Sequence, residues 1–524
     1  MYCKLILYLF YALGISLFFN CQQIPYSLSK TRTYYFSSTG NDFNDGSKNT
    51  PWRTISQLNK LTLVPGDTVF FEGGHTFAGN IFIDSASSGT IRQPIVLTSY
   101  GNGKAIINSA QFTALTLSHV EYVKICNLDF NGIGRKAGNT KDGVIISDCR
   151  NIFIDSLAVS GFQKSGLLVY SSFDIDINRV YAHDNGAAGI FISGAKAKED
   201  CANIHVSYCT SENNPGDPTN FTNHSGNGIL AGMCRKVTIE YCVATNNGWD
   251  MPRKGNGPVG IWTYESDSVV IQHCISYCNK TSPGAADGGG FDLDGGVTNS
   301  IIQYCLSYQN QGSGFGLFQY AGASNWYNNT IRFCISENDG AISAAHAGVF
   351  IWNSSEDSNQ LKNCFFYNNT VFNSKGAAIS YEKQSKNSGL RFYNNIFVAT
   401  DSLVTGKETN SVYLGNNWYS IHDRFNMNGM TNFRTWATAF HKEQYKGSTT
   451  GSNFNPVFYN PGEVTTILPG VLHACNNYRL PQQSILDRSG LNLQQLFGID
   501  NGGKTFNQDK APVNGVGACS KVYN

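Results

Sequence analysis

The fold is decided by Gly260-Ile261-Trp262-Thr263-Tyr264, followed four residues later by Val269-Val270-Ile271-Gln272-His273-Cys274. In both segments apolar residues alternate with variable ones. A period of two residues predicts a β-strand with one buried face, because successive side chains point to opposite sides. Two short strands this close together, with no helical period between them, indicate a small β unit.

This unit recurs along the chain, and the recurrence predicts the architecture. Successive glycines that open the first strand are 23, 39, 32, 30, 24 and 34 residues apart. Repeats of this length that contain two or three short strands predict a parallel β-helix, in which each coil stacks on the next. The other copies of the glycine-led strand begin at Gly166, Gly189, Gly228, Gly290, Gly314 and Gly348.

The first coils also carry a family resemblance. Tyr34-Tyr35-Phe36-Ser37-Ser38-Thr39-Gly40-Asn41-Asp42, Pro51-Trp52-Arg53-Thr54-Ile55 and Pro65-Gly66-Asp67-Thr68-Val69 are similar to the opening coils of the pectin-lyase-like superfamily. The resemblance implies an all-β, right-handed parallel β-helix over nearly the whole mature chain. It also implies a secreted, polysaccharide-active protein, although hydrolases, lyases and binding proteins share this fold.

The sequence divides into four regions. We expect an export signal at 1–21, an N-terminal cap with the first coils at 33–118, and β-helix repeats with the site at 119–400. The last coils and an irregular C-terminal cap take 401–524. Trp52 to Leu61 can form a short amphipathic helix, which predicts a small helical cap at the N-terminal end, since repeat arrays need polar end caps.

The N-terminus predicts export. Lys4 precedes an apolar run from Leu5 to Phe19, which is short for a membrane span and typical of a signal sequence. Cys21 follows the run, where a lipoprotein would carry its lipid, but Phe18-Phe19-Asn20 matches the usual lipobox poorly. A secreted protein and a surface protein anchored in the outer membrane through Cys21 therefore both remain open.

Charge argues against nucleic acid as a partner. The formal net charge of the 524 residues is +1, only 14% of them are charged, and no basic stripe is interleaved with aromatics. We expect a monomer whose partner is a polysaccharide or an oligosaccharide.

The cysteines repeat with the coils. Cys209, Cys242, Cys274, Cys305 and Cys334 occupy one register of the second strand. This regularity predicts a ladder of stacked thiols rather than disulfides, because free cysteine behaves as a small apolar side chain. Beyond Cys334 the ladder continues either with Cys364 or with Asn369 and Asn395. A bridge between Cys475 and Cys519 stays open, and no CxxC pair suggests a metal site.

The strongest chemical signal is Asp287-Gly288-Gly289-Gly290-Phe291-Asp292-Leu293-Asp294-Gly295-Gly296. As a strand it presents Asp292 and Asp294 on one face, roughly 6–7 Å apart at their roots. Two carboxylates at this spacing suit acid/base chemistry on a glycosidic bond, or a hard cation.

Stacked coils bring aromatic residues beside this pair, because equivalent outward positions lie about 4.8 Å apart. Flat rings next to carboxylates suit a sugar chain, and Gly316 beside Asp292 predicts room for a sugar ring. Alternatively, the long connections at 213–227 and 247–258 cover the rings and leave an ordinary core layer. The predicted substrate-binding aromatics are Trp262, Tyr264, Phe318, Phe350 and Trp352.

Weaker candidates surround the pair. Glu265 is a third candidate catalytic carboxylate, and Arg253 and Lys254 are candidates for binding an anionic sugar. Asp287 would join Asp292 and Asp294 if the site held Ca²⁺. His224 and His346 lie near coil corners, and we expect Glu382 to lie too far along the stack.

Three functions compete. The first is a glycoside hydrolase that uses Asp292, Asp294 and Glu265 and needs no cofactor. The second is a Ca²⁺-dependent lyase on a uronate polymer, with Lys254 or Arg253 as the base. The third is a non-catalytic glycan-binding protein, which needs only the aromatics. The sequence favours the hydrolase, because a lyase on this fold would show a denser basic set near the metal.

Overall fold

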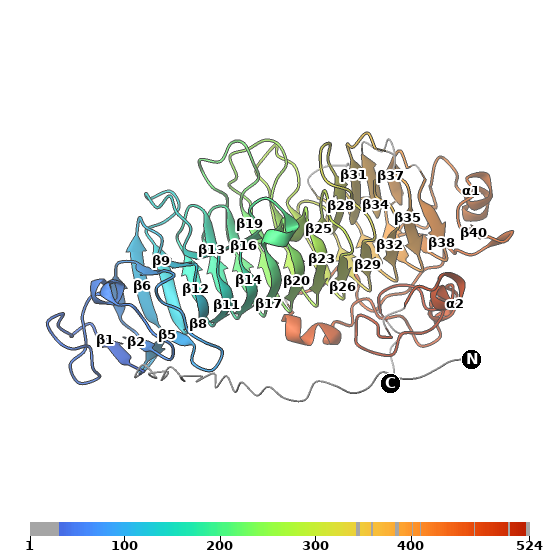
Figure 1. Cartoon of the computed structure of the whole chain (residues 1–524). Coiled ribbons are helices and arrows are strands. Elements are labelled where there is room, and N and C mark those ends of the chain that lie inside the picture. Colours follow the sequence, from blue (N-terminus) through green and yellow to red (C-terminus); the bar gives the residue numbers. More distant parts are fainter. Residues whose placement is uncertain are drawn as a thin grey trace, which may run out of the picture.

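The structure is a computed structural model that describes residues 31–519 except 342–345, 358–359, 383–386, 401, 409, 466 and 501–502. Three parallel sheets run along an elongated solenoid (Figure 1), so the predicted all-β parallel β-helix is confirmed. The predicted export signal, with Cys21, lies outside the described residues.

Each coil contributes one strand to sheet A, then one to sheet B, then one to sheet C. Sheet A consists of β1 (Thr33–Phe36), β2 (Thr68–Glu72), β5 (Ile95–Tyr100), β8 (Glu121–Cys126), β11 (Arg150–Asp155), β14 (Phe173–Asn178), β17 (Ala202–Ser207), β20 (Arg235–Glu240), β23 (Asp267–Gln272), β26 (Ile301–Gln303), β29 (Thr330–Arg332), β32 (Cys364–Tyr367), β35 (Leu390–Tyr393) and β38 (Val412–Leu414). Sheet B consists of β3 (Thr76–Ala78), β6 (Ala105–Ala110), β9 (Leu128–Gly132), β12 (Ala158–Ser160), β15 (Tyr181–His183), β18 (Thr210–Glu212), β21 (Val243–Thr245), β24 (Ile275–Tyr277), β27 (Leu306–Tyr308), β30 (Ile335–Glu337), β33 (Thr370–Asn373), β36 (Ile396–Ala399) and β39 (Asn417–Ser420). Sheet C consists of β4 (Ile81–Ile83), β7 (Leu115–Ser118), β10 (Val144–Ser147), β13 (Ser165–Tyr170), β16 (Ala188–Ser193), β19 (Asn227–Gly232), β22 (Val259–Tyr264), β25 (Gly289–Leu293), β28 (Phe315–Gln319), β31 (Val349–Asn353), β34 (Ile379–Glu382) and β37 (Val404–Gly406).

The remaining elements lie at the edges and ends of the solenoid. They are η1 (Ile55–Lys60), η2 (Lys198–Asp200), α1 (Phe433–Ala439), β40 (Gln444–Tyr445), β41 (Ser448–Thr449), η3 (Pro469–Ala474), η4 (Ile485–Asp487) and α2 (Leu493–Phe497). The amphipathic helix expected between Trp52 and Leu61 is the shorter 3-10 helix η1, which buries Ile55 and Leu58. Its role as an end cap stays a prediction.

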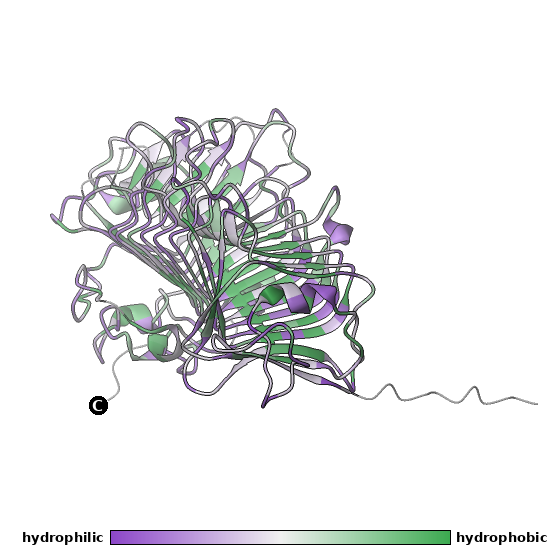
Figure 2. Ribbon diagram, turned by 90° about the vertical axis from the view of Figure 1, so that its left-hand side faces the viewer, coloured by the Kyte–Doolittle hydropathy of each residue, from purple (hydrophilic) through white to green (hydrophobic). Residues whose placement is uncertain are grey.

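The coil β20–β21–β22 shows how the sheets are joined. Two residues, Tyr241 and Cys242, turn from sheet A to sheet B, and two more, Glu265 and Ser266, turn from sheet C to the next strand of sheet A. In contrast, residues 246–258 connect sheet B to sheet C. Inward side chains of all three sheets form one apolar core, seen as green strands enclosed by purple loops in Figure 2.

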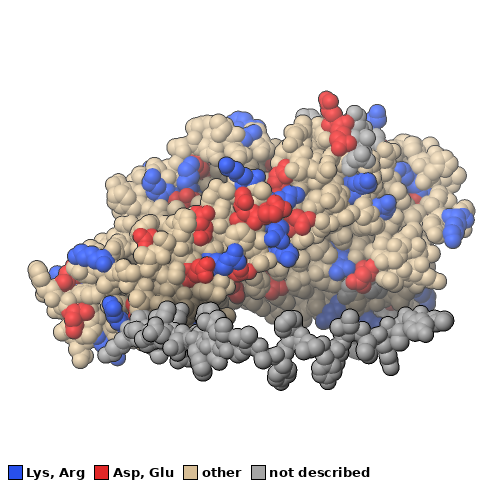
Figure 3. Space-filling model, in the orientation of Figure 1, with Lys and Arg blue, Asp and Glu red and all other residues tan. Residues whose placement is uncertain are grey.

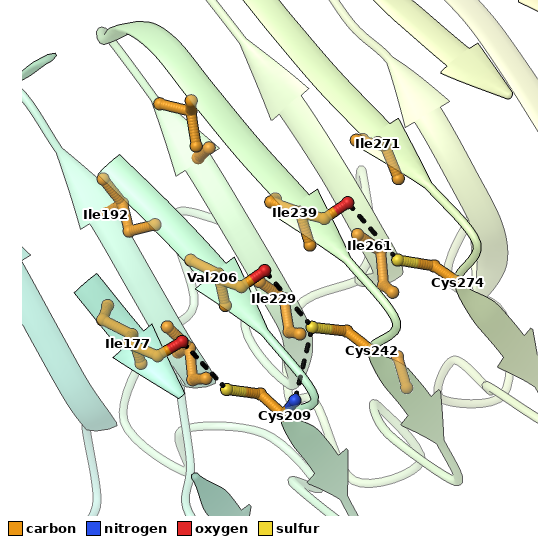
Figure 4. Packing of buried hydrophobic residues seen from close by; sticks show 14 of the residues in the cluster. Ile177, Ile192, Val206, Cys209, Ile229, Ile239, Cys242, Ile261, Ile271 and Cys274 are labelled. Atoms are coloured by element: carbon orange, nitrogen blue, oxygen red, sulfur yellow. Dashed lines mark hydrogen bonds between the residues drawn. The ribbon is translucent and has the colours of Figure 1, made fainter. Parts of the chain in front are cut away.

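The predicted cysteine ladder is confirmed, but each cysteine lies two residues beyond the end of its strand and not within it. The five cysteines are buried and unbridged, and they lie in the A–B turns rather than in the strands. Figure 4 shows the stack, in which the Cys209 amide donates to Cys242 Sγ at 3.4 Å. Each thiol also donates to a strand carbonyl of the preceding coil, such as Cys242 to Val206 O at 3.7 Å. The cysteine ladder therefore fills the corner between sheets A and B, and its sulfur atoms also accept hydrogen bonds from turn amides.

Asparagine, not Cys364, continues this ladder. The Cys334 amide donates to Asn369 Oδ1 at 2.9 Å, and the Asn369 amide donates to Asn395 Oδ1 at 2.9 Å. Asn416 follows, and the ladder ends on the buried carboxylate of Glu443. Cys364 instead begins β32.

A second ladder runs along the B–C corner. Buried asparagine amides donate to the next asparagine one coil further on, for example Asn247 Nδ2 to Asn279 Oδ1 at 2.9 Å. The ladder is Asn185, Asn214, Asn247, Asn279 and Asn310, and it ends on Asp339. It explains the repeated glycine, because a Cβ at Gly260 would lie 2.7 Å from Asn279 Nδ2 and 2.0 Å from Ser276 Oγ.

The C-terminal region does more than close the last coil. Helix α1 seals the end of the core, where Trp436 packs against Trp418. The chain after Asn455 then folds back along the outside of the later coils, below β26 to β38 in Figure 1. There Tyr478 donates to the buried Glu337 at 2.6 Å. The expected cap is therefore also a strap, and its Cys475 and Cys519 are free thiols rather than a bridge.

The surface shows no broad field of one charge on the face seen in Figure 3, where Lys and Arg are interspersed with Asp and Glu. Over the residues that the structure describes, no helix is long and apolar enough to cross a membrane.

Candidate functional site

The site lies on the outer face of sheet C, where the predicted outward rows are confirmed. Trp262 on β22 pairs with Asp292 on β25, which pairs with Gly316 on β28, and Gly316 pairs with Phe350 on β31. In the second row Tyr264 precedes Asp294, whose amide donates to Thr263 O at 2.9 Å. Phe318 pairs with Trp352, and Trp352 pairs with Glu382.

A cleft of about 580 Å³ opens above these strands. Its roof and sides come from the B–C connections at 213–226, 246–258 and 278–288, together with His346 before β31 and Tyr320 after β28. It is lined by Asn223, His224, Arg253, Asn256, Gly257, Val259, Trp262, Tyr264, Ala286, Asp287, Asp292, Asp294, Phe318, Tyr320, His346, Phe350, Trp352 and Glu382. The rows that the repeats predicted thus meet in one concave site.

Aromatic rings form the two walls on either side of the carboxylates. Trp262 lies 5.5 Å from Tyr264 and makes an edge-on contact with His224 at 4.9 Å. On the other side, Phe350 makes edge-on contacts with Phe318 at 5.3 Å and with His346 at 5.1 Å. The expectation that the long connections cover the rings holds in part, because Trp262 is 3% and Phe350 5% exposed. Even so, the cleft remains open between the walls.

Asn227 fixes the first wall. Its side-chain oxygen accepts a hydrogen bond from Trp262 Nε1 at 3.1 Å, and its amide nitrogen contacts His224 Nδ1 at 3.0 Å. The position of Asn227 directly before a repeat glycine gave no signal of this role.

Three carboxyl groups occupy the middle of the cleft. Burial, together with the nearby Asp294 and Asp287, raises the pKa of Asp292 well above its usual value. Burial raises the pKa of Asp294 to about 7, with Asp287 and Glu265 adding to the shift and the Gly295 amide opposing it. The pKa of Asp287 is raised to about 6, again by burial, although the Gly257 amide donates to Asp287 Oδ2 at 2.7 Å. Near neutral pH the Asp287 carboxyl is therefore more ionised than the Asp294 carboxyl.

The basic groups of the cleft are few. Burial lowers the pKa of His224 and of His346 to about 4, so both rings are neutral at pH 7. Arg253 lines the cleft, and its guanidinium donates to Thr222 O, which ties two B–C connections together. The lining is therefore rich in carboxyl groups.

Two predicted residues lie outside the cleft. Glu265 accepts hydrogen bonds from the Ser324 amide at 2.8 Å and from the Tyr320 hydroxyl at 3.4 Å, so it lies behind Tyr320. Lys254 donates to Pro283 O and lines an adjoining depression. Glu382, expected to lie too far along the stack, does line the cleft. Tyr320 was missed, although it continues the alternation from Phe318.

The room predicted at Gly316 is already filled. A Cβ at this position would lie 2.8 Å from Asp292 Oδ1 and 2.8 Å from the Phe318 ring. The glycine therefore accommodates the protein's own carboxyl group and ring rather than a sugar.

The Ca²⁺ set stays a prediction. Among the described residues, no group of three His, Cys, Asp or Glu side chains is arranged to hold a metal ion, and this includes Asp287, Asp292 and Asp294.

Ion pairs and hydrogen bonds hold the connections above the cleft. Asp217, whose side chain is fully buried, accepts from Lys164, from Gln163 at 3.0 Å and from the Thr219 amide at 2.9 Å. Arg135 joins two connections, since it donates to Gly216 O at 3.0 Å and pairs with Asp250. The roof is thus anchored to coils on its N-terminal side.

The three parallel sheets define a parallel β-helix protein. Its candidate site is a cleft on sheet C, in which aromatic rings flank a group of carboxyl side chains. The model of the Pel9A-like right-handed β-helix region matches residues 34–338, and the chain belongs to this family. The solenoid is accordingly right-handed.

Individual relatives were found in sequence and in structure. A lacto-N-biosidase of Bifidobacterium longum subsp. longum is 25% identical over 514 aligned residues, which cover 75% of this chain and 30% of the enzyme. The chain thus spans about a third of that relative's length. A lacto-N-biosidase structure from Eubacterium ramulus superposes with a TM-score of 0.49 and 17% identity, covering 68% of this chain and 67% of the other. For the pectate lyase Pel9A the TM-score is 0.46 at 15% identity, with 94% and 98% covered.

Proposed function

We propose that the protein acts on carbohydrate and hydrolyses a glycosidic bond in the sheet C cleft. The observation that carries the proposal is the group of three carboxyl residues, Asp287, Asp292 and Asp294, between two aromatic walls. Aromatic faces bind the apolar faces of sugar rings, and paired carboxyl groups carry out most glycoside hydrolysis. The 25% identity to a lacto-N-biosidase supports the same class of reaction.

In this proposal Asp294 is the general acid. Its pKa of about 7 leaves a large share of the carboxyl protonated near neutral pH, and a catalytic pKa near the working pH gives the best proton transfer. The proton would pass from Asp294 to the glycosidic oxygen as the bond to the sugar carbon breaks.

Asp287 is the second catalytic carboxylate. With the lowest pKa of the three groups, about 6, it is mostly ionised at pH 7 and is held in place by the Gly257 amide. An ionised carboxylate can stabilise or attack the sugar carbon that becomes positive, or activate the water that does so. Both Asp287 and Asp294 line the cleft, so both can reach a bound sugar.

Charge favours hydrolysis of a neutral or amino sugar over the alternative, a Ca²⁺-dependent lyase. The carboxyl groups of Asp287, Asp294 and Glu382 would repel a uronate, while Arg253 is the one Lys or Arg among the described lining residues. Lys254, one of the two residues expected to act as the base of a lyase, lies outside the cleft, where it donates a hydrogen bond to Pro283 O.

The test is product analysis of the purified protein on neutral, amino-sugar and uronate glycans, including lacto-N-biosides. We expect new reducing ends without an ultraviolet band near 235 nm. Asp294→Asn and Asp287→Asn should each lower kcat/KM by about 10²–10⁴-fold. Asp155→Asn, a carboxylate paired with Arg179 at 2.6 Å on the far side of the coil, is the matched control.

Other outcomes would replace the proposal. An ultraviolet band that disappears with EDTA would mean a lyase. Glycan binding retained in both Asn variants, without turnover in the wild type, would mean a binding protein.

Export, a lipid on Cys21 and a monomeric state belong to the same proposal. Fractionation of cells should place the protein outside the cytoplasm, and mass spectrometry of the mature N-terminus should show whether Cys21 carries lipid. Light scattering of the purified mature protein should give a monomer mass somewhat below 57.4 kDa, the mass of the full chain with its export signal.

A further inference from the structure

The B–C connection at 213–226 carries His224 to the wall of the cleft that Trp262 forms. The two rings meet edge to face, with their centroids 4.9 Å apart. Trp262 is only 3% exposed, whereas His224 is half-buried and lines the cleft. A sugar at this wall therefore meets the His224 ring as well as the rim of the indole.

Hydrogen bonds fix which way the Asn227 side chain points. Its Oδ1 accepts from the Trp262 indole at 3.1 Å and from the Val259 amide at 3.3 Å, and both of these groups can only donate. Its Nδ2 donates to Ala187 O at 3.1 Å, and a carbonyl can only accept. A rotated side chain would set donor against donor and acceptor against acceptor at all three contacts. The nitrogen is therefore the atom that faces His224.

This orientation sets the tautomer of His224. Asn227 Nδ2 lies 3.0 Å from His224 Nδ1, so Nδ1 accepts the hydrogen bond and carries no proton. Burial, together with the positive charge of Arg253, lowers the pKa of His224 to about 4, so at pH 7 the neutral ring has its single proton on Nε2. Within the described part of the chain, Nε2 has no hydrogen-bond partner and is not fully buried. The ring therefore presents one neutral donor that these residues do not use.

Contacts within the connection hold the ring in place. The His224 carbonyl accepts from the Asn220 side chain at 3.3 Å, and the His224 amide donates to Asn223 Oδ1 at 2.9 Å. The adjacent Ser225 is buried, and its hydroxyl accepts from the Asp217 amide at 3.0 Å. Because such a donor is already ordered, less entropy is lost when it binds a ligand.

We propose that His224 is a specificity-determining residue, whose Nε2–H donates a hydrogen bond to an acceptor oxygen of the bound sugar. The tautomer stands on the contacts alone, whereas the role in binding rests on the proposed hydrolysis. A neutral donor suits a hydroxyl, ring or acyl oxygen, and it stabilises a carboxylate less than a cation would. At this wall the residue therefore favours neutral and acylated sugars over uronates.

Nitrogen-15 NMR of protein labelled at histidine tests the tautomer. His224→Gln identifies the signals of His224 among those of the 10 histidines. We expect Nε2 to be protonated and Nδ1 to be bare at pH 7. A proton on Nδ1, or a charged ring, would overturn the proposal.

Two variants separate the hydrogen bond from packing against Trp262. His224→Phe keeps a flat ring but loses the donor, and we expect kcat/KM to fall about tenfold, mainly through a higher KM. His224→Gln loses the ring but can place an N–H near the position of Nε2, so it should stay within about threefold of the wild type. The reverse order, with His224→Phe active and His224→Gln impaired, would show that the ring only packs.

Substrate analogues identify the oxygen. The analogue that lacks the accepting hydroxyl or acyl group should lose about tenfold with the wild type and nothing further with His224→Phe, because one bond can be lost only once. Losses that add for every analogue would mean that His224 contacts no sugar oxygen. If the wild type hydrolyses nothing, the proposed function fails and the binding role with it, while the NMR spectrum still decides the tautomer.

Discussion

The A–B turns and the B–C connections are both lined by a ladder of buried side chains, one per coil, yet they differ in length. The A–B turns keep two residues in coil after coil, as at Tyr241 and Cys242. The B–C connections range from residues 79–80 in one coil to residues 213–226 in another. The loops that carry His224, Arg253 and Asp287 into the cleft come from the second group.

The two ladders also differ in chemistry over most of their length, although asparagines take the A–B corner from Asn369 onward, where the turns still have two residues. A thiol fills the A–B corner, and the turn backbone bonds directly to the next coil, so an extra residue would break the stack. At the B–C corner an asparagine side chain bonds to backbone and side chains of both neighbours, as Asn279 does with Ala244 O at 3.2 Å and Asn310 Oδ1 at 2.9 Å. The coil is therefore secured before the connection begins, and the residues that follow are free to build a site.

The largest expected effect comes from loosening a B–C connection. Asp217→Ala removes the buried anchor of residues 213–226, which carry His224 into the cleft. We expect kcat/KM to fall about a hundredfold, because small displacements of binding groups cost this much. Asp155→Ala, at the end of β11 next to an A–B turn, should leave activity unchanged. Equal losses in the two variants would show that the cleft does not depend on the connections.

The next largest effect is expected on stability, when one side chain of the asparagine ladder is removed. Asn279→Ala leaves Ala244 O and the Asn247 amide without side-chain partners, so we expect a loss of about 3 kcal/mol in the free energy of unfolding. Chemical denaturation of the purified protein measures this loss. A cost below about 1 kcal/mol would mean that the asparagines do not secure the coils.

The buried acids at the ends of the two ladders, Glu443 and Asp339, should make the free energy of unfolding depend on pH. Burial raises the pKa of Glu443 to about 7, above the value near 4.5 of an unfolded chain. Between these values the folded state holds a proton that the unfolded state has released. The stabilisation is complete below pH 4.5 and is lost as the pH rises through 7, by about 2 kcal/mol. In Glu443→Gln the fall in unfolding free energy between pH 5 and 7.5 should be shallower by this amount. Burial also raises the pKa of Asp339 to about 7, so Asp339→Asn should behave alike at the other ladder. Unchanged slopes would contradict both raised pKa values.

The smallest effect is expected in the thiol ladder. Cys274→Ala deletes one buried sulfur and weak S–H hydrogen bonds, which should cost about 1 kcal/mol. Thermal unfolding beside Asn279→Ala measures the contrast. If the cysteine variant loses as much as the asparagine variant, the two corners are equally strong and the difference in loop length needs another cause.

The sequence predicted the features that repeat with the coil. The glycine-led pattern placed Trp262, Asp292 and Phe350 in one outward row because strand register follows from periodicity alone. The asparagine ladder could have been found in the same way, since its members are 29, 33, 32, 31 and 29 residues apart. It was missed because asparagine is common in turns and its side-chain partners lie one coil away.

The sequence did not predict the features that do not repeat from coil to coil. Nothing in the pattern placed Glu265 behind Tyr320, or Lys254 on Pro283 O, because both contacts depend on how irregular loops fold. The strap was equally hidden, since its anchor, Glu337, is 141 residues from Tyr478. Long-range contacts of this kind leave no trace in local alternation.

The strap divides the solenoid mechanically. Coils up to about β23 touch mainly their two neighbours, whereas Glu337, Phe372 and Tyr367 on later coils are joined through residues 455–519. A chain stretched between its ends should therefore shed its first coils singly, with small steps in force, and then yield the strapped half in one large step. The cleft lies where these two regimes meet.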